Sequence, residues 1–142
     1  MDTSPPMSFM VLATTRDGHL LMVQGPNGWT LPHGTVPPRH CPVLTARRTL
    51  MDTTGYDRGV TDAYAISVTH RPAVSLTYVL DGGHTPTVPA GVNKHLPANA
   101  GWLPLRELHE PPPIVRYALT AAAQRRRVPV LINGERPDAA YT

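Results

Sequence analysis

Two neighbouring segments, residues 61–70 and 73–81, alternate apolar and polar side chains, and this pattern constrains the fold more than any other feature of the sequence. One face of the first carries Tyr64, Ile66, Val68 and His70, and one face of the second carries Val74, Leu76, Tyr78 and Leu80. Strict alternation is typical of half-buried antiparallel strands. Because only Arg71-Pro72 separates the segments, we expect them to pair as a hairpin within a β-sheet.

Short apolar runs add further strands to this sheet. The expected strands are residues 8–14, 19–24, 29–31 and 101–105, with an edge strand at 128–132. Asp17-Gly18 lies between the first two runs, and this dipeptide between apolar runs signals a hairpin. Gly82-Gly83 predicts a turn, and residues 82–100 are expected to form a long loop rich in Gly, Pro and Asn. Loops of that length are more often functional than short connections are.

Two segments have the spacing of helices. Residues 41–54 contain Pro42, which suits the first helical position, and are followed by Gly55, which suits the left-handed residue that ends many helices. The second expected helix covers residues 114–127 and ends in three arginines, whose charge favours a helix C-terminus. Strands and helices in this order predict an α+β fold, an α/β/α sandwich with a mixed sheet between helices.

The composition narrows the class of protein. The 142 residues predict one domain, residues 1–142. A single cysteine and the absence of a secretory signal predict a soluble, cytoplasmic protein. No apolar run reaches the ~20 residues that a membrane span needs, and the formal charge of +3 does not predict binding to nucleic acid. The expected partner is a small-molecule substrate, and the sequence is compatible with a homodimer without requiring one.

The segment from Gly34 to Tyr56 has the spacing of a known catalytic cassette. It resembles the Nudix box, in which a glycine is followed after five residues by glutamate and after seven more by Arg-Glu-apolar-x-Glu-Glu-x-Gly-apolar. Residues that match this pattern are Gly34, Arg48, Leu50 and Gly55. The four glutamate positions hold His40, Thr49, Asp52 and Thr53 instead.

The residues around the box extend the resemblance over most of the chain. Residues 29–32 resemble the strand that precedes the box in Nudix proteins, and residues 101–108 resemble a late strand and turn. The resemblance implies the Nudix fold, Mg²⁺ or Mn²⁺ held by carboxylates of the box helix, and cleavage of a diphosphate linked to another group. Asp52 is the one carboxylate left in the box. Because hard cations need several oxygen ligands, we expect weak Mg²⁺ binding, slow or absent cleavage, and no metal or other cofactor.

Histidines flank the box and are candidates for the chemistry. His33 and His40 lie on either side of Pro37-Pro38, and an imidazole can act as a general acid or base near neutral pH. The expected catalytic residues are His33, His40, Arg48 and Asp52. The expected substrate-binding residues are His70, Tyr78, His84, His95 and Trp102. The competing interpretation is that these histidines are ordinary surface residues of loops.

Three further interpretations stay open. Arg48 and Asp52 are four residues apart, so they can form a salt bridge on the surface of the helix. His33 and His40 could bind Zn²⁺, although their spacing matches no strong zinc motif. Cys41, at the start of a helix, could be a nucleophile or a small buried residue.

These observations leave three functions. The first is a biosynthetic Nudix-fold enzyme that performs metal-independent acid–base chemistry (cyclisation, isomerisation, dehydration or hydrolysis) on a small metabolite. The second is a residual Mg²⁺-dependent Nudix hydrolase of a nucleoside or prenyl diphosphate. The third is a non-catalytic module that binds a ligand. The histidines and the missing glutamates favour the first function.

Overall fold

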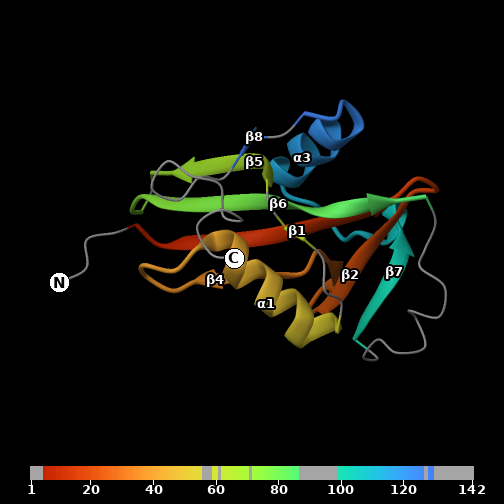
Figure 1. Cartoon of the computed structure of the whole chain (residues 1–142), viewed down its shortest axis with the longest axis horizontal. Coiled ribbons are helices and arrows are strands. Elements are labelled where there is room, and N and C mark those ends of the chain that lie inside the picture. The colour runs from red at the N-terminus through yellow and green to blue at the C-terminus, as the bar shows by residue number, and fades with distance from the viewer. Residues whose placement is uncertain are drawn as a thin grey trace.

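The fold is known from a computed structural model, which describes residues 5–55, 59–60, 62–70, 72–86, 99–126 and 128–129. Within these residues, eight strands form one mixed sheet between two α-helices (Figure 1). The strands are β1 (Met7–Thr15), β2 (His19–Gly25), β3 (Gly28–Thr30), β4 (His33–Val36), β5 (Asp62–Thr69), β6 (Ser75–Thr85), β7 (Ala100–Pro104) and β8 (Val128–Pro129). The helices are α1 (Pro42–Thr54), α3 (Pro113–Ala123) and the short 3₁₀ helix η1 (Leu105–Glu107).

Strand β1 is the centre of the sheet. The strand order is β3-β2-β1-β6-β5-β8, while β4 also pairs with β1 and β7 also pairs with β2. On one edge, β4 pairs with the first half of β1, and β2 pairs with its end. On the other edge, β6 runs parallel to β1, with Phe9 opposite Tyr78. The remaining strand pairs are antiparallel.

The two faces of the sheet bury separate apolar cores. Alternation along β1 sends Phe9 and Val11 to the face under α1, and Leu12 to the face under α3. The core under α1 also contains Leu50 of the helix, and the core under α3 contains Val115. Each helix is thus fixed to the sheet by one apolar side, which leaves its outer side for other contacts.

The predicted α+β class is confirmed, and the first helix covers Pro42–Thr54, with the predicted first residue, Cys41, as its N-cap. Pro42 occupies its first turn, and Gly55 has φ 72°, the left-handed conformation expected after a helix. The Gly55 N–H donates to the carbonyl of Met51 at 2.8 Å. The hairpins β1–β2 and β5–β6 are also confirmed.

Two local predictions are wrong. Residues 33–36 were not among the expected strands, and they form β4 because β1 offers them an unpaired edge. In β5 the register shifts between Ala63 and Ala65, so Tyr64 is buried under α3 while Ile66 and Val68 are 41% and 49% exposed. One face of residues 61–70 is therefore not buried as a unit.

Two boundaries also differ from the predictions. Strand β6 extends to Thr85, so Gly82-Gly83 lies inside a strand and not in a turn. Helix α3 ends at Ala123, so the arginine at 125 lies beyond it, in a left-handed conformation with φ 56°. Most of the predicted loop, with residues 87–98, lies outside the described residues, as do residues 127 and 130–132 of the predicted C-terminal segments. Neither described α-helix has the length and hydrophobicity that a membrane span requires.

Candidate functional site

A groove of about 450 Å³ runs along the outer side of α1, between the helix and the loop that precedes it. Thr45, Arg48, Thr49 and Asp52 lie on the same side of α1, because residues three and four apart share a helix face. We call this the α1 groove. Its lining residues are Thr35, Pro37, Arg39, His40, Cys41, Leu44, Thr45, Arg48, Thr49 and Asp52. The groove is of a size that holds a small organic molecule.

The groove is positioned by close packing beneath it. Val43, Ala46 and Leu50 of α1 are at most 1% exposed and hold the inner side of the helix against the sheet. A Cβ on Gly34 of β4 would lie 3.0 Å from Phe9 Cζ and 3.7 Å from Thr49 Cγ2. Glycine at this position therefore lets β4 lie close to Phe9 in the core, whereas the distance to Thr49 is that of an ordinary van der Waals contact.

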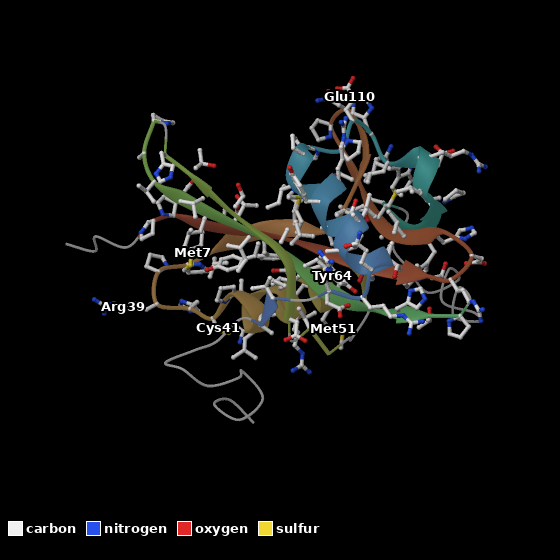
Figure 2. All side chains as sticks on the ribbon, turned by 90° about the horizontal axis from the view of Figure 1, so that it is seen from above. Met7, Arg39, Cys41, Met51, Tyr64 and Glu110 are labelled. Atoms are coloured by element: carbon white, nitrogen blue, oxygen red, sulfur yellow. The ribbon has the colours of Figure 1, made fainter. Side chains whose placement is uncertain are left out.

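A turn before α1 presents His40 to the groove. The His40 N–H donates to the carbonyl of Pro37 at 3.1 Å, and Arg39 has φ 67°. Pro38 followed by a residue with positive φ is the pattern of a type II turn, in which the left-handed position favours glycine. A non-glycine residue in this conformation is strained by about 1–2 kcal/mol. Figure 2 shows Arg39 projecting outward from this turn, with Cys41 at the start of the helix.

The tautomer of His40 follows from its hydrogen bond. His40 Nδ1 lies 3.0 Å from the Pro38 carbonyl oxygen. A carbonyl can only accept, so Nδ1 carries the proton and donates it. In the neutral ring Nε2 then holds the free lone pair, which is the arrangement that a general base needs.

Arg48 and Asp52 both line the α1 groove, but they are not paired with each other. Among the ion pairs between described residues, none joins these two side chains. The helical rise places their Cα atoms about 6 Å apart, and it places Asp52 about 15 Å from the start of α1, where His40 lies. The groove therefore has an imidazole at one end, a carboxylate at the other and Arg48 between them, and Arg39 adds a second positive charge.

His33 is separated from the α1 groove. It lines a different hollow of about 270 Å³ together with Trp29 and His109. His33 Nδ1 donates to the carbonyl of Leu31 at 2.9 Å. This hollow exists because the chain after β7 returns to β3, where the His109 N–H donates to the Trp29 carbonyl at 2.9 Å. The structure thus does not bring His33 and His40 together.

The predicted substrate-binding residues are also dispersed. Trp102 is 4% exposed within the core under α1, and Tyr78 packs against that core with its hydroxyl 4.0 Å from Met7 Sδ. Burial raises the pKa of Tyr78 above its usual 10.0. Trp102 is therefore a core residue, and Tyr78 is a partly buried residue at the margin of the same core. His70 is exposed beyond the end of β5 and is not among the lining residues of the α1 groove.

His84 and His95 complete the predicted set. His84 belongs to the end of β6 and lines a hollow beside α3 with Thr14 and Arg125. His95 lies outside the described residues. Of the nine predicted site residues, the structure places His40, Arg48 and Asp52 in the α1 groove.

Sequence reasoning missed Arg39 as a residue of the site. The dipeptide Pro37-Pro38 could have indicated this role. Proline at the second position of a turn fixes the backbone conformation, and so the direction of the side chain, of the residue that follows it. Cys41 also lines the groove, yet it is only 8% exposed as a free thiol. Its burial supports the interpretation of a small apolar residue at the start of α1.

Solved structures with a similar arrangement of strands and helices identify the fold. The MutT protein from Methanosarcina mazei Go1 is similar over 88% of this chain and 99% of its own, with 17% sequence identity and a TM-score of 0.60. A NUDIX hydrolase from Nitrosomonas europaea is similar over 89% of this chain and 94% of its own, with 16% identity and a TM-score of 0.63. The chain has the Nudix fold.

A third similar structure holds a ligand. It is the NUDIX domain of Shewanella oneidensis NrtR complexed with ADP ribose, which covers 87% of this chain and 90% of its own, with 14% identity and a TM-score of 0.59. By sequence, the chain matches no protein-family model and no curated protein.

The Nudix resemblance implies a divalent cation on α1, and the donor atoms there do not fit one. Asp52 is the only carboxylate among the described residues that line the groove. The hydroxyl of Thr53 donates to the Thr49 carbonyl at 2.7 Å, so its proton is used within the helix. Across the described residues, no three His, Cys, Asp or Glu side chains gather where they could hold a metal ion. Mg²⁺ requires several oxygen ligands in octahedral geometry, and one carboxylate does not supply them.

Proposed function

We propose that the protein is a Nudix-fold enzyme that performs metal-independent acid–base chemistry on a small anionic metabolite in the α1 groove. The observation that carries this proposal is that an imidazole and a guanidinium line the same groove, in which Asp52 is the single carboxylate among the described lining residues. The reaction class is cyclisation, isomerisation, dehydration or hydrolysis, each of which needs a proton moved at a defined atom.

Each groove residue has a distinct role in this proposal. Arg48 binds the anionic group of the substrate, because a guanidinium forms charge-assisted hydrogen bonds with carboxylate or phosphate. His40 accepts or donates a proton through Nε2, since Nδ1 is held by the Pro38 carbonyl. Arg48 lies about 9 Å along the helix from its start. The substrate therefore has its reacting atom about that far from its anionic group, and Asp52 contacts only its far end.

The test is a search for turnover with and without a chelator. The protein is incubated with a pool of anionic metabolites, and consumed and formed species are followed by mass spectrometry. We expect the activity to persist in EDTA, to fall at least a hundredfold in His40→Gln, and to be unchanged in His70→Gln, which alters an exposed histidine outside the groove. Loss of activity in EDTA that Mg²⁺ restores would contradict the proposal and favour the residual hydrolase.

A second candidate function is ligand binding without turnover. The NrtR domain, whose fold this chain shares, was solved with ADP ribose. The α1 groove could hold the phosphates of such a ligand through Arg39 and Arg48. Thermal stabilisation by ADP ribose, lost in Arg48→Gln and accompanied by no chemical change of the ligand, would support this function in place of the enzyme.

A further inference from the structure

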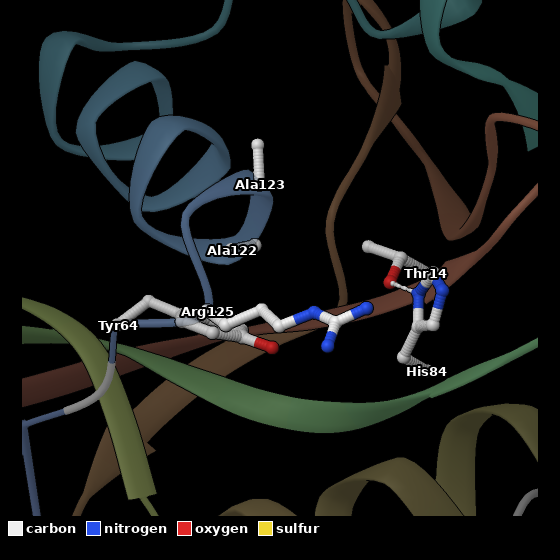
Figure 3. Close-up of a pocket in the computed structure, with 6 residues that line it drawn as sticks. All are labelled: Thr14, Tyr64, His84, Ala122, Ala123 and Arg125. Carbon is white, nitrogen blue, oxygen red and sulfur yellow. Dashed lines mark hydrogen bonds between the residues drawn. The ribbon is translucent and has the colours of Figure 1, made fainter.

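A second hollow lies beside the end of α3, on the face of the sheet opposite α1. It has a volume of about 460 Å³, and its lining residues are Thr14, Tyr64, His84, Ala122, Ala123 and Arg125 (Figure 3). A neighbouring hollow of about 450 Å³ shares His84 and Arg125 with it and adds Arg16 and Pro86. We call the two together the α3 hollow. Each is within the size range of small-molecule sites.

The α3 hollow gathers positively charged and proton-donating groups. Arg16 comes from the turn after β1, His84 from the end of β6, and Arg125 from the residues after α3. No aspartate or glutamate is among the described residues that line it. Asp17, next to Arg16 in the chain, accepts a hydrogen bond from the Thr15 hydroxyl and pairs with His19 instead. The local charge therefore favours an anion.

The polar side chains are held in place from different elements. Thr14 Oγ1 and His84 Nδ1 are 2.7 Å apart, and these residues are direct neighbours in the parallel pairing of β1 with β6. With Thr14 as the donor, the proton of neutral His84 is on Nε2, which can then donate to a ligand. Figure 3 shows the guanidinium of Arg125 extending from the end of α3 toward the Thr14–His84 pair.

The backbone at Arg125 is unusual for an arginine. The Arg126 N–H donates to the Ala121 carbonyl at 2.8 Å, and the Arg125 N–H donates to the Ala122 carbonyl at 3.1 Å. With φ 56° at Arg125, these bonds form a Schellman motif in which the left-handed residue is most often glycine. An arginine in this conformation makes the backbone less stable than glycine would, and its guanidinium is one of the groups that line the hollow.

The wall of the α3 hollow also has an apolar part, next to its positively charged groups. Tyr64 is 7% exposed and packs in the core under α3, and Ala122 belongs to the side of the helix that packs on the same core. We infer that the α3 hollow binds a small phosphate monoester whose phosphate contacts Arg16, His84 and Arg125 and whose apolar group lies against Tyr64 and Ala122. This site is separate from the α1 groove, so it does not depend on the function proposed there.

The experiment uses phenyl phosphate as the probe and backbone amide shifts in two-dimensional NMR as the readout. We expect saturable shifts at Thr14, His84 and Ala122, whether or not amides of the α1 groove also respond. Arg125→Gly removes the side chain but suits the left-handed backbone, so the fold is kept. We expect this variant to bind phenyl phosphate at least tenfold more weakly, because a hydrogen bond to a charged group is lost. Arg126→Gly, a matched change at the adjacent arginine, is expected to leave the affinity unchanged.

Three results would overturn the inference. The first is an absence of shifts around the α3 hollow at millimolar phenyl phosphate. The second is an equal loss of affinity in Arg125→Gly and Arg126→Gly, which would indicate a general charge effect. The third is equal affinity for phenyl phosphate and inorganic phosphate, which would remove the role given to Tyr64 and Ala122.

Discussion

The substitution Gly82→Ala tests the packing of β6 against β1. Residues of these two strands contribute to the apolar cores on both faces of the sheet. A Cβ on Gly82 would lie 2.6 Å from Val11 Cγ1 and 3.1 Å from Ala13 Cβ. Carbon atoms pack at about 3.5–4.0 Å, so the strands would have to separate by about 1 Å at this point. Val11 is fully buried, and its β-branched side chain has restricted rotamer freedom. Overpacking of this kind costs about 1–3 kcal/mol, which lowers the Tm by roughly 3–9 °C.

The matched control is Gly101→Ala in β7, where a Cβ would meet no atom within 4 Å. Both substitutions reduce the entropy of the unfolded chain, which stabilises each variant equally by about 0.4–1 kcal/mol. The difference between their free energies of unfolding therefore isolates the effect of the clash. The assay is urea unfolding followed by circular dichroism. If Gly82→Ala proves as stable as Gly101→Ala, the register of β1 with β6 is not as described.

Three further predictions address titration and burial. Burial raises the pKa of Tyr78 above 10.0. The stability that Tyr78 contributes is therefore complete below pH 10 and is lost as the pH rises through its folded-state pKa. In Tyr78→Phe, the free energy of unfolding, measured as a function of pH, should fall less steeply at alkaline pH. The hydrogen bond from Thr15 lowers the pKa of Asp17 below 3.8. The stability that Asp17 contributes is therefore present above pH 3.8 and is lost as the pH falls through its folded-state pKa. In Asp17→Asn, the free energy of unfolding should fall less steeply in acid, and an unchanged acid dependence would refute the role given to this hydrogen bond. Cys41 is 8% exposed, so iodoacetamide should label it slowly in the native protein and rapidly in urea. Rapid labelling of the native protein would instead support the interpretation of Cys41 as a nucleophile.

Local chemistry made much of the fold predictable from the sequence. Pro42 and Gly55 mark the ends of α1 through rules that involve only neighbouring residues. The hairpin between β1 and β2 follows from Asp17-Gly18 in the same way. Strand β4 could not be predicted, because its four residues acquire strand geometry only by pairing with β1, far away in the chain.

The site was predictable along α1 and not beyond it. Arg48 and Asp52 share a helix face by their spacing alone, and His40 is fixed by the turn that starts the helix. His33 is close to His40 in the sequence, yet it belongs to a hollow completed by His109. His84 reaches the α3 face because β6 continues past Gly82-Gly83. Both outcomes depend on long-range pairing, which side-chain spacing does not encode.

Helix α1 lacks the ligands for a divalent cation, and Mn²⁺ binding tests this most directly. Mn²⁺ is added to the protein while its paramagnetic broadening of the Thr49 and Asp52 amides is followed by NMR. We expect no saturable broadening at these amides. In the triple variant His40→Glu/Thr49→Glu/Thr53→Glu, which restores carboxylates to α1 and the turn before it, we expect a one-to-one Mn²⁺ site. Stoichiometric, saturable broadening in the unaltered protein would contradict the account.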